Sequence, residues 1–247
     1  MRRIVIVGAT SAIAEHCARI WNSGEPVELT LVGRDRRRLD LVAKDLQVRN
    51  ATNTVEVVVT DFLDPIAVQR TVDSAAVRGP VDIVLVAHGT LPDQAIVEES
   101  LALSHAAIEI NALSPVMFAE GFANQMLHAG TGTLALISSV AGDRGRRSNY
   151  IYGASKALLS TFAAGLQHRA AGTKVKVVLI KPGPTDTPMT RELKSGGARL
   201  APVGDVAAQI VRAIDRGTPV LYVPGIWRVI MFVIRAIPAK VFNRLPL

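Results

Sequence analysis

The chain has 247 residues, of which 49% are hydrophobic and 20% charged, and a formal net charge of +7. That length suits one large α/β domain whose core needs no metal or disulfide, and the single cysteine, Cys17, excludes an internal disulfide and favours a reducing compartment, the cytoplasm. Nucleic-acid binding is disfavoured despite the basic balance, because no recognition motif is present, aromatic residues are few, and the basic residues concentrate at turns and in the tail.

Short β-branched runs alternate with helical patterns along the chain. The runs cover residues 4–7, 27–32, 55–59, 81–86, 134–137, 175–180 and 220–223, and the helical patterns cover 12–21, 36–46, 65–77, 101–127, 150–170 and 203–215. This alternation predicts a single doubly wound Rossmann-type α/β domain over residues 1–223, with about seven parallel strands and helices on both faces. Residues 224–247 form an apolar and basic helical tail. In such sheets ligands bind at the carboxyl ends of the strands.

The turn after the first strand, GATSAIA at residues 8–14, has the features of a phosphate-binding turn. Gly8 permits a tight turn, and Thr10, Ser11 and the first N–H groups of the following helix can face a pyrophosphate. Ala12 and Ala14 stand where the usual pattern has glycines. The alternative is an ordinary strand-to-helix turn that binds nothing.

The turn after the second strand, GRDRRR at residues 33–38, indicates which dinucleotide is bound. NAD binders place an acidic residue at this point to accept from the ribose 2′-hydroxyl, whereas here Gly33 is followed by Arg34. A guanidinium suits a 2′-phosphate, so NADPH is favoured over NADH. The other three arginines, residues 36–38, are interpreted as a solvated helix start.

An acid/base pair is predicted in the helix that begins near residue 150. Tyr152 and Lys156 are four residues apart, so they lie on one face, one turn apart. A cation beside the phenol draws its pKa towards the working range, and the phenol can then protonate an alkoxide. Ser139 closes the apolar run TLALISS at 133–139 and could hold the substrate oxygen. The alternative is a chance match; Tyr150 has no such lysine, because residue 154 is alanine.

The tail after residue 217 carries no acidic residue, and its cations are interspersed with apolar and aromatic side chains. Its uninterrupted apolar run, residues 229–234, is far shorter than the roughly twenty residues that cross a bilayer. A basic, aromatic-containing helix over 226–247 can lie in the interface of an anionic membrane. Alternatively, it packs on its own sheet or on a partner subunit.

Together these motifs resemble the short-chain dehydrogenase/reductase family over residues 3–223. The matching stretches are GATSAIA (8–14), TDFL (60–63), AHG (87–89), IN (110–111), Ser139, YGASK (152–156) and PGPTDT (182–187). The sequence VAHG at 86–89 departs from the family's N-N-A-G and removes side-chain hydrogen bonds that brace the central strand, so its stability must come from elsewhere.

The resemblance implies roles for individual residues. Asn111 would sustain a water-linked proton path to Lys156, which would also hold the nicotinamide ribose; Asp61 would contact the adenine, and Thr187 the nicotinamide end. Asn111 could otherwise be a helix-interior polar residue that bonds locally. The catalytic set is Asn111, Ser139, Tyr152 and Lys156. The cofactor-binding set is Gly8, Thr10, Ser11, Ile13, Arg34, Asp61, Gly89, Tyr152, Lys156, Pro182, Gly183, Thr185 and Thr187. Family members are commonly dimers or tetramers through the helices that carry Asn111 and Tyr152.

The chain also resembles a narrower group, the bacterial decaprenylphosphoryl-2-keto-erythro-pentose reductases. The resemblance lies in three stretches: the tail, RGRRSNYIYGASK at 144–156, and RELK at 191–194. The chains of that group end like RLPL at 244–247. This resemblance implies reduction of a 2-keto sugar on a polyprenyl phosphate, an oxidase partner that produces the ketone, and a position peripheral to the inner face of the membrane. The phosphate would explain Arg144, Arg146 and Arg147.

Two rival functions stay open. One is a general NADPH-dependent carbonyl reductase for another lipophilic ketone. The other is a non-catalytic protein that senses NADP, but such a protein has no need of the acid/base set Ser139, Tyr152 and Lys156. No metal site is expected, since the five histidines lie far apart without ligand spacing.

Overall fold

A computed structural model describes residues 1–245, so Pro246 and Leu247 of the predicted L-P ending lie outside the described residues. The chain forms a seven-stranded sheet in the order β3-β2-β1-β4-β5-β6-β7, and every neighbouring pair is parallel. The predicted doubly wound fold is therefore confirmed. The strands are β1 (Arg2–Val7), β2 (Val27–Gly33), β3 (Thr54–Val59), β4 (Ile83–Val86), β5 (Thr131–Ile137), β6 (Lys174–Pro182) and β7 (Val220–Val223).

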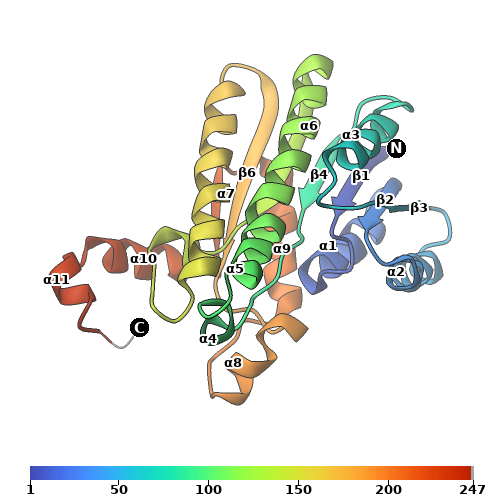
Figure 1. Ribbon diagram of the computed structural model, residues 1–247. Helices are drawn as coiled ribbons and strands as arrows, with labels where there is room; N and C mark the ends of the chain where they lie inside the picture. The colour runs from blue at the N-terminus through green and yellow to red at the C-terminus, as the bar shows by residue number, and fades with distance from the viewer. Residues whose placement is uncertain (246–247) are drawn as a thin grey trace.

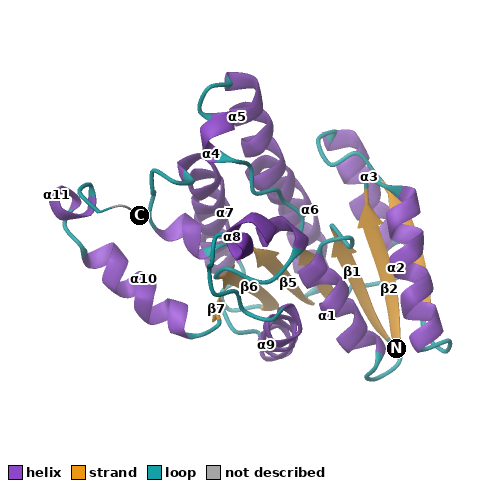
Figure 2. Cartoon of the chain, turned by 90° about the horizontal axis from the view of Figure 1, so that it is seen from below, coloured by secondary structure: helices purple, strands orange, loops and turns teal. Residues whose placement is uncertain are grey.

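Helices cover both faces of the sheet (Figures 1 and 2). They are α1 (Ala12–Asn22), α2 (Arg36–Arg49), α3 (Pro65–Ala76), α4 (Gln94–Val97), α5 (Leu101–Ile108), α6 (Ser114–Ala129), α7 (Tyr150–Arg169), α8 (Arg191–Ser195), α9 (Val203–Arg216), α10 (Ile226–Ala236) and α11 (Ala239–Phe242). Shorter helical turns are η1 (Glu109–Leu113), η2 (Val140–Asp143) and η3 (Pro188–Thr190).

Alternation along the strands builds a core on each face. In β1, Ile4 and Ile6 pack in one cluster with α1, α2 and α9, whereas Val5 and Val7 pack in the other with α3, α6 and α7. Strands covered on both faces are almost continuously apolar, which is why the β-branched runs located them.

Several element boundaries differ from the predicted ranges. β4 begins at Ile83 rather than at residue 81, and β5 begins at Thr131 rather than at residue 134. β5 ends at Ile137, as the run 134–137 predicted, so that Ser139 at the end of the apolar run 133–139 follows the strand. The helix predicted over 101–127 is divided by the π-helical turn η1. Pro115 lies at the start of α6 and has no N–H to donate to the carbonyl four residues earlier, that of Asn111. The wider turn accommodates this lost bond.

The helical stretch Leu101–Ala129 is long and apolar enough, by length and composition, to cross a bilayer. Its second half is a core helix instead. Phe118, Phe122 and Met126 of α6 are buried in the core cluster that contains Val5 and Val7 of β1. The fold therefore accounts for this apolar helix without a membrane.

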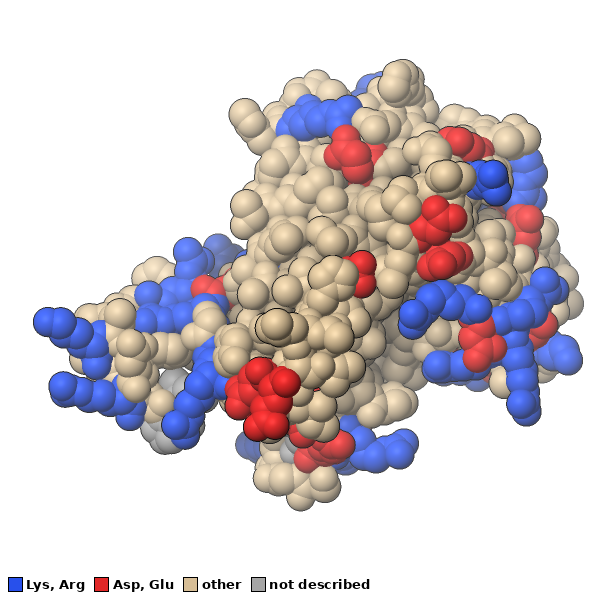
Figure 3. All heavy atoms as spheres, viewed as in Figure 1, with Lys and Arg blue, Asp and Glu red and all other residues tan. Residues whose placement is uncertain are grey.

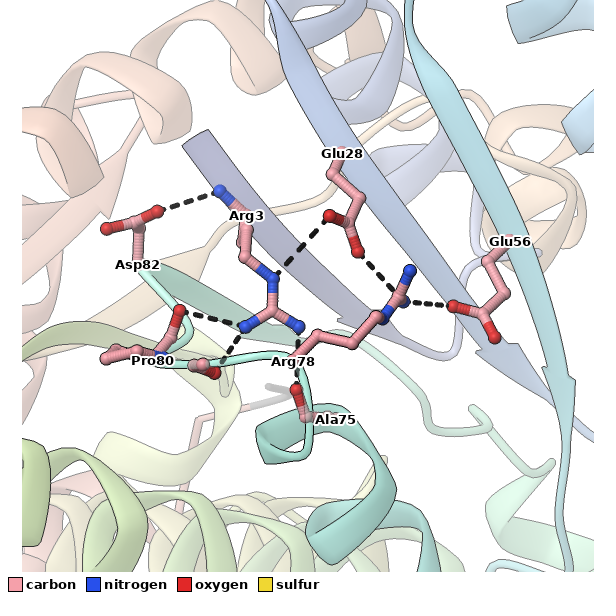
Figure 4. A network of polar contacts seen from close by, with 8 residues as sticks. Arg3, Glu28, Glu56, Ala75, Arg78, Pro80 and Asp82 are labelled. Atoms are coloured by element: carbon pink, nitrogen blue, oxygen red, sulfur yellow. Dashed lines mark hydrogen bonds and ion pairs between the residues drawn. The ribbon is translucent and has the colours of Figure 1, made fainter. Parts of the chain in front are cut away.

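An ion network closes the edge of the sheet where the strands begin (Figure 4). Arg3 donates to the carbonyl of Ala75 at 2.8 Å, and its Nε lies 3.6 Å from the carboxylate of Glu28. Arg78 bridges Glu28, at 2.8 Å, and Glu56. Two guanidinium groups thus compensate the charge of Glu28, which is buried. These ion pairs tie β1, β2 and β3 to the turn that follows α3.

Candidate active site

Two adjoining cavities open at the carboxyl edge of the sheet. The first, here called the crevice, measures about 620 Å³ and lies over the ends of β1 and β2. The second, here called the pocket, measures about 330 Å³ and lies over β5, α7 and the segment 182–190. Their shared lining includes Ser11, Gly89 and Thr187. They meet between β1 and β4, where the strand order reverses, which is the usual ligand position in such sheets.

The predicted phosphate turn lines the crevice through Gly8, Thr10, Ser11 and Ile13. Gly8 has φ +80°, and a Cβ at this position would come within 2.7 Å of the backbone nitrogen of His88, so only glycine allows this approach. The Ser11 hydroxyl makes no capping hydrogen bond at the start of α1. Both that hydroxyl and the first N–H groups of α1 are thus available to an anion, and the turn fits a pyrophosphate.

Two arginines and the carboxylate residue Asp35 line the crevice beyond the end of β2. Arg34 lines it, with its guanidinium 5.8 Å from the centre of the Phe62 ring. Arg38 lines it as well, although the sequence pattern placed this residue in a solvated helix start. Asp61 is exposed and accepts from the N–H of Leu63 at 2.9 Å; its predicted adenine contact stays a prediction.

His88 replaces the bracing that the VAHG sequence removes. Its Nε2 lies 2.9 Å from the Ser114 hydroxyl, which ties the end of β4 to α6. The ring also packs edge-on against Phe62 and Phe118, with centroids 4.5 and 5.8 Å away. Burial lowers the pKa of His88 to about 3, with the charges of Lys156 and Arg34 acting in the same direction. The imidazole is therefore neutral and stabilises this junction by packing and hydrogen bonding.

Ser139, Tyr152 and Lys156 come together in the lining of the pocket. Tyr152 and Lys156 lie one turn apart on α7, with the Lys156 Nζ 5.8 Å from the centre of the Tyr152 ring. Ser139 follows β5, and its Oγ accepts from the N–H of Ala141 at 3.1 Å. The three groups are positioned to hold and protonate a carbonyl oxygen.

Burial is the main cause of the pKa shifts of Tyr152 and Lys156. It raises the pKa of Tyr152, and hydrogen bonding with Ser139 only opposes this effect. Burial also lowers the pKa of Lys156 to about 8. The sequence argument considered only the ammonium beside the phenol, but in the polypeptide alone desolvation is the larger influence on Tyr152. The phenol therefore stays protonated at neutral pH, as a proton donor requires.

Hydrogen bonds fix Lys156 against the end of β5. Its Nζ donates to the carbonyl of Ile137 at 3.2 Å. Its own backbone carbonyl accepts from the hydroxyls of Ser138, at 2.9 Å, and Ser160, at 2.8 Å. The sequence analysis missed these two serines. Ser138 links the end of β5 to α7, and Ser160, a residue of α7, bonds the Ser138 hydroxyl at 2.8 Å.

Asn111 lies in the π-helical turn η1 and is fully buried. Its Oδ1 accepts from the N–H of Thr90 at 2.8 Å. A Cβ on Gly89 would lie 2.7 Å from this oxygen and 3.3 Å from the Lys156 Nζ, so both polar groups flank Gly89. Asn111 therefore does not bond within its own helix: its side chain ties η1 to the loop after β4, and it lines the pocket close to Lys156. π-turns are frequent at functional sites.

The segment 182–190 forms one wall of the pocket through Pro182, Gly183, Thr185 and Thr187. The Thr185 hydroxyl donates to the Gly183 carbonyl at 3.0 Å, so it serves the turn itself. The indole of Trp227, a residue of the tail, occupies the space where a Cβ on residue 183 would lie. No local sequence signal indicated that the tail reaches the pocket.

The three arginines of the 144–147 segment differ in position. Arg144 donates to the carbonyls of Ile234, at 2.6 Å, and Ile237, at 2.6 Å, and so serves the tail. Arg146 lines the pocket, whereas Arg147 is exposed. Of the three arginines predicted to explain a substrate phosphate, only Arg146 lines the pocket.

Comparisons with known proteins identify the family of this chain. A family model for short chain dehydrogenase matches residues 2–197. An uncharacterized oxidoreductase of Streptomyces coelicolor is 35% identical over 99% of this chain and 96% of its own length. An uncharacterized oxidoreductase of Mycobacterium tuberculosis is 31% identical over 98% of this chain and 96% of its own.

The chain belongs to the short-chain dehydrogenase/reductase family. It is thereby an NAD(P)-dependent oxidoreductase. A short-chain type dehydrogenase/reductase from Mycobacterium ulcerans has the same fold, with a TM-score of 0.80 at 20% identity over 99% of this chain and 98% of that one. A variant of actinorhodin polyketide ketoreductase, solved with NADPH, has a TM-score of 0.80 at 23% identity over 90% of this chain and 95% of that one.

The pH dependence of reduction should follow Lys156. With a pKa of about 8, its ammonium loses its proton as the pH rises through that value, while Tyr152, with its raised pKa, stays protonated. We therefore expect kcat/KM for reduction, measured between about pH 6 and 10, to fall above about pH 8. Lys156→Arg keeps a charge that does not titrate here and should move the fall to higher pH. A wild-type profile that stays level beyond pH 9 contradicts the assignment to Lys156.

Proposed function

We propose that the protein reduces a ketone to a secondary alcohol with NADPH. The observation that carries this proposal is the set Ser139, Tyr152 and Lys156, buried in a pocket that adjoins a phosphate-binding crevice. A bound nicotinamide supplies the hydride. Ser139 hydrogen-bonds the carbonyl oxygen, Tyr152 gives that oxygen a proton as its negative charge develops, and the Lys156 ammonium stabilises the phenolate left behind. Asn111 supports proton return to Lys156.

The preference for NADPH is supported by the basic side of the crevice. Gly33 provides no carboxylate for a ribose 2′-hydroxyl, and Arg34 and Arg38 both line this region. Two guanidinium groups suit the extra phosphate of NADPH. The polyketide ketoreductase of similar fold was solved with the same dinucleotide.

The substrate, in this proposal, carries an anionic group and is a polyprenylphosphoryl 2-keto-pentose. Arg146 lines the pocket, and among the described residues its guanidinium has no hydrogen bond or ion pair. Burial lowers the pKa of this guanidinium. A partly desolvated cation without a partner favours a negative group on the ligand. A partner oxidase would supply the ketone, and the enzyme would act in the cytoplasm as a homodimer or homotetramer through the helices that carry Asn111 and Tyr152.

Replacing Tyr152 tests the reaction itself. Tyr152→Phe should lower kcat for reduction by at least about 10², the loss expected for a general acid, while NADPH still binds. Tyr150→Phe is the matched control, because Tyr150 is two residues away and 42% exposed, and its turnover should be unchanged. Measurements are NADPH oxidation against a panel of ketones and fluorescence titration of NADPH. Equal turnover by the Tyr152→Phe variant and the wild type removes the phenol from the mechanism; absence of turnover in the wild type, with NADPH binding intact, favours the sensor.

The cofactor assignment predicts a selective effect at Arg34. Arg34→Ala should raise KM for NADPH by about tenfold or more and leave KM for NADH nearly unchanged, because only NADPH carries the 2′-phosphate. Arg37→Ala, a change of a neighbouring exposed arginine outside the crevice, is the control. An equal rise in both Michaelis constants for Arg34→Ala shows that this side chain does not read the phosphate.

The substrate assignment predicts that Arg146 discriminates by charge. Arg146→Gln should lower kcat/KM for an enzymatically generated polyprenylphosphoryl keto-pentose by about ten- to a hundredfold, the value of a charged hydrogen bond, and leave a neutral aliphatic ketone unaffected. Arg147→Gln is the control. Should the wild type reduce neutral ketones as efficiently as the phosphorylated one, the general carbonyl reductase becomes the better description.

A further inference from the structure

The tail forms an arm, here defined as residues 226–245, whose first helix has two apolar faces. Its inner face packs on the body: Met231 is buried, and Trp227, Ile230 and Ile234 are partly buried. These four positions follow the helical spacing i, i+3, i+4, i+7. α10 contacts β7 and η2. The inner face therefore accounts for only half of the helix's apolar residues.

The outer face of α10 is apolar and exposed. Ile226, Val229, Phe232 and Val233 are 61%, 60%, 75% and 55% accessible. The arm extends from the body of the molecule beside β7 (Figures 1 and 2). A contiguous apolar face of this kind on a protein surface marks an interaction site.

Cations accompany this face along the whole arm. Arg228 and Arg235, two turns apart on α10, line a shallow surface groove together with Val229, Phe232 and Tyr222. Lys240 and Arg244 follow, and the arm contains no acidic residue. Figure 3 shows Lys and Arg side chains gathered over this part of the molecule. The partner must therefore be both apolar and anionic.

Arg144 fixes the orientation of the arm. Its guanidinium donates to the carbonyls of Ile234 and Ile237 at the end of α10. It also lies over the Phe242 ring of α11, 3.8 Å from the centroid. The orientation of α10 therefore does not depend on a partner, and its outer face points away from the body of the molecule.

We propose that the arm docks on an anionic lipid surface. The side chains of Val229 and Phe232 enter the acyl boundary, and Arg228 and Arg235 bind phosphate groups of the lipids. A groove that places guanidinium groups beside aromatic and aliphatic side chains matches an anionic amphiphile, and each cation near an anionic leaflet adds about 1 kcal/mol. Trp227, on the inner face of the same helix, lines the pocket, so the docked helix also forms part of the pocket wall. This inference stands independently of the substrate proposed above.

The test is co-sedimentation of the whole protein with vesicles of phosphatidylcholine, with and without about 30% phosphatidylglycerol. The wild type should bind the anionic vesicles at least about tenfold more than the neutral ones. The double change Val229→Ser and Phe232→Ser should remove most of this binding, and Arg228→Gln with Arg235→Gln should remove the preference for anionic lipid.

Matched controls are Leu101→Ser and Val48→Ser, which remove exposed apolar side chains (89% and 88% accessible) outside the arm and should leave vesicle binding unchanged. NADPH affinity verifies that each variant is folded. Equal vesicle binding by the arm variants and the wild type overturns the proposal. So does a loss of self-association in the arm variants, by light scattering, without any vesicle binding by the wild type, because the outer face would then be an interface between copies of this chain.

Discussion

A buried ammonium without a carboxylate partner is the constraint on which the site depends. Lys156 is 3% exposed, and no described carboxylate pairs with it; the Ile137 carbonyl is its hydrogen-bond acceptor. Such a charge is costly unless it is hydrogen-bonded. Ser138, which follows β5, holds α7 beside that acceptor by bonding the Lys156 carbonyl, at 2.9 Å, and the Ser160 hydroxyl, at 2.8 Å. The same docking of α7 places Tyr152, one turn earlier on the helix, in the lining of the pocket.

Much of this arrangement can be predicted from the sequence because parallel strands are constrained on both faces. Strands such as Ile83–Val86, and β1 from Ile4 to Val7, are apolar at successive positions, so short β-branched runs locate them. The carboxyl ends of parallel strands then meet at one edge, which is why turns far apart in the sequence, at Gly8 and Ser139, could be assigned to one site. The four-residue step from Tyr152 to Lys156 needs only a helix.

The rest depends on tertiary contacts that no local pattern encodes. Arg144 and the carbonyls at the end of α10 are about ninety residues apart, and only the folded chain shows that this arginine serves the arm. The contact of Trp227 with Gly183 is of the same kind. Pro115 was a local signal for the interruption of the helix at Asn111, but a proline near a helix start is also ordinary, so the π-turn required the structure.

The neutral imidazole of His88 adds no positive charge to the crevice that it lines. With a pKa of about 3, the ring stays uncharged in the folded chain even in mild acid. An unfolded chain, in contrast, takes up a proton on this ring as the pH falls through about 6.5. Mild acid therefore lowers the free energy of unfolding through this one side chain.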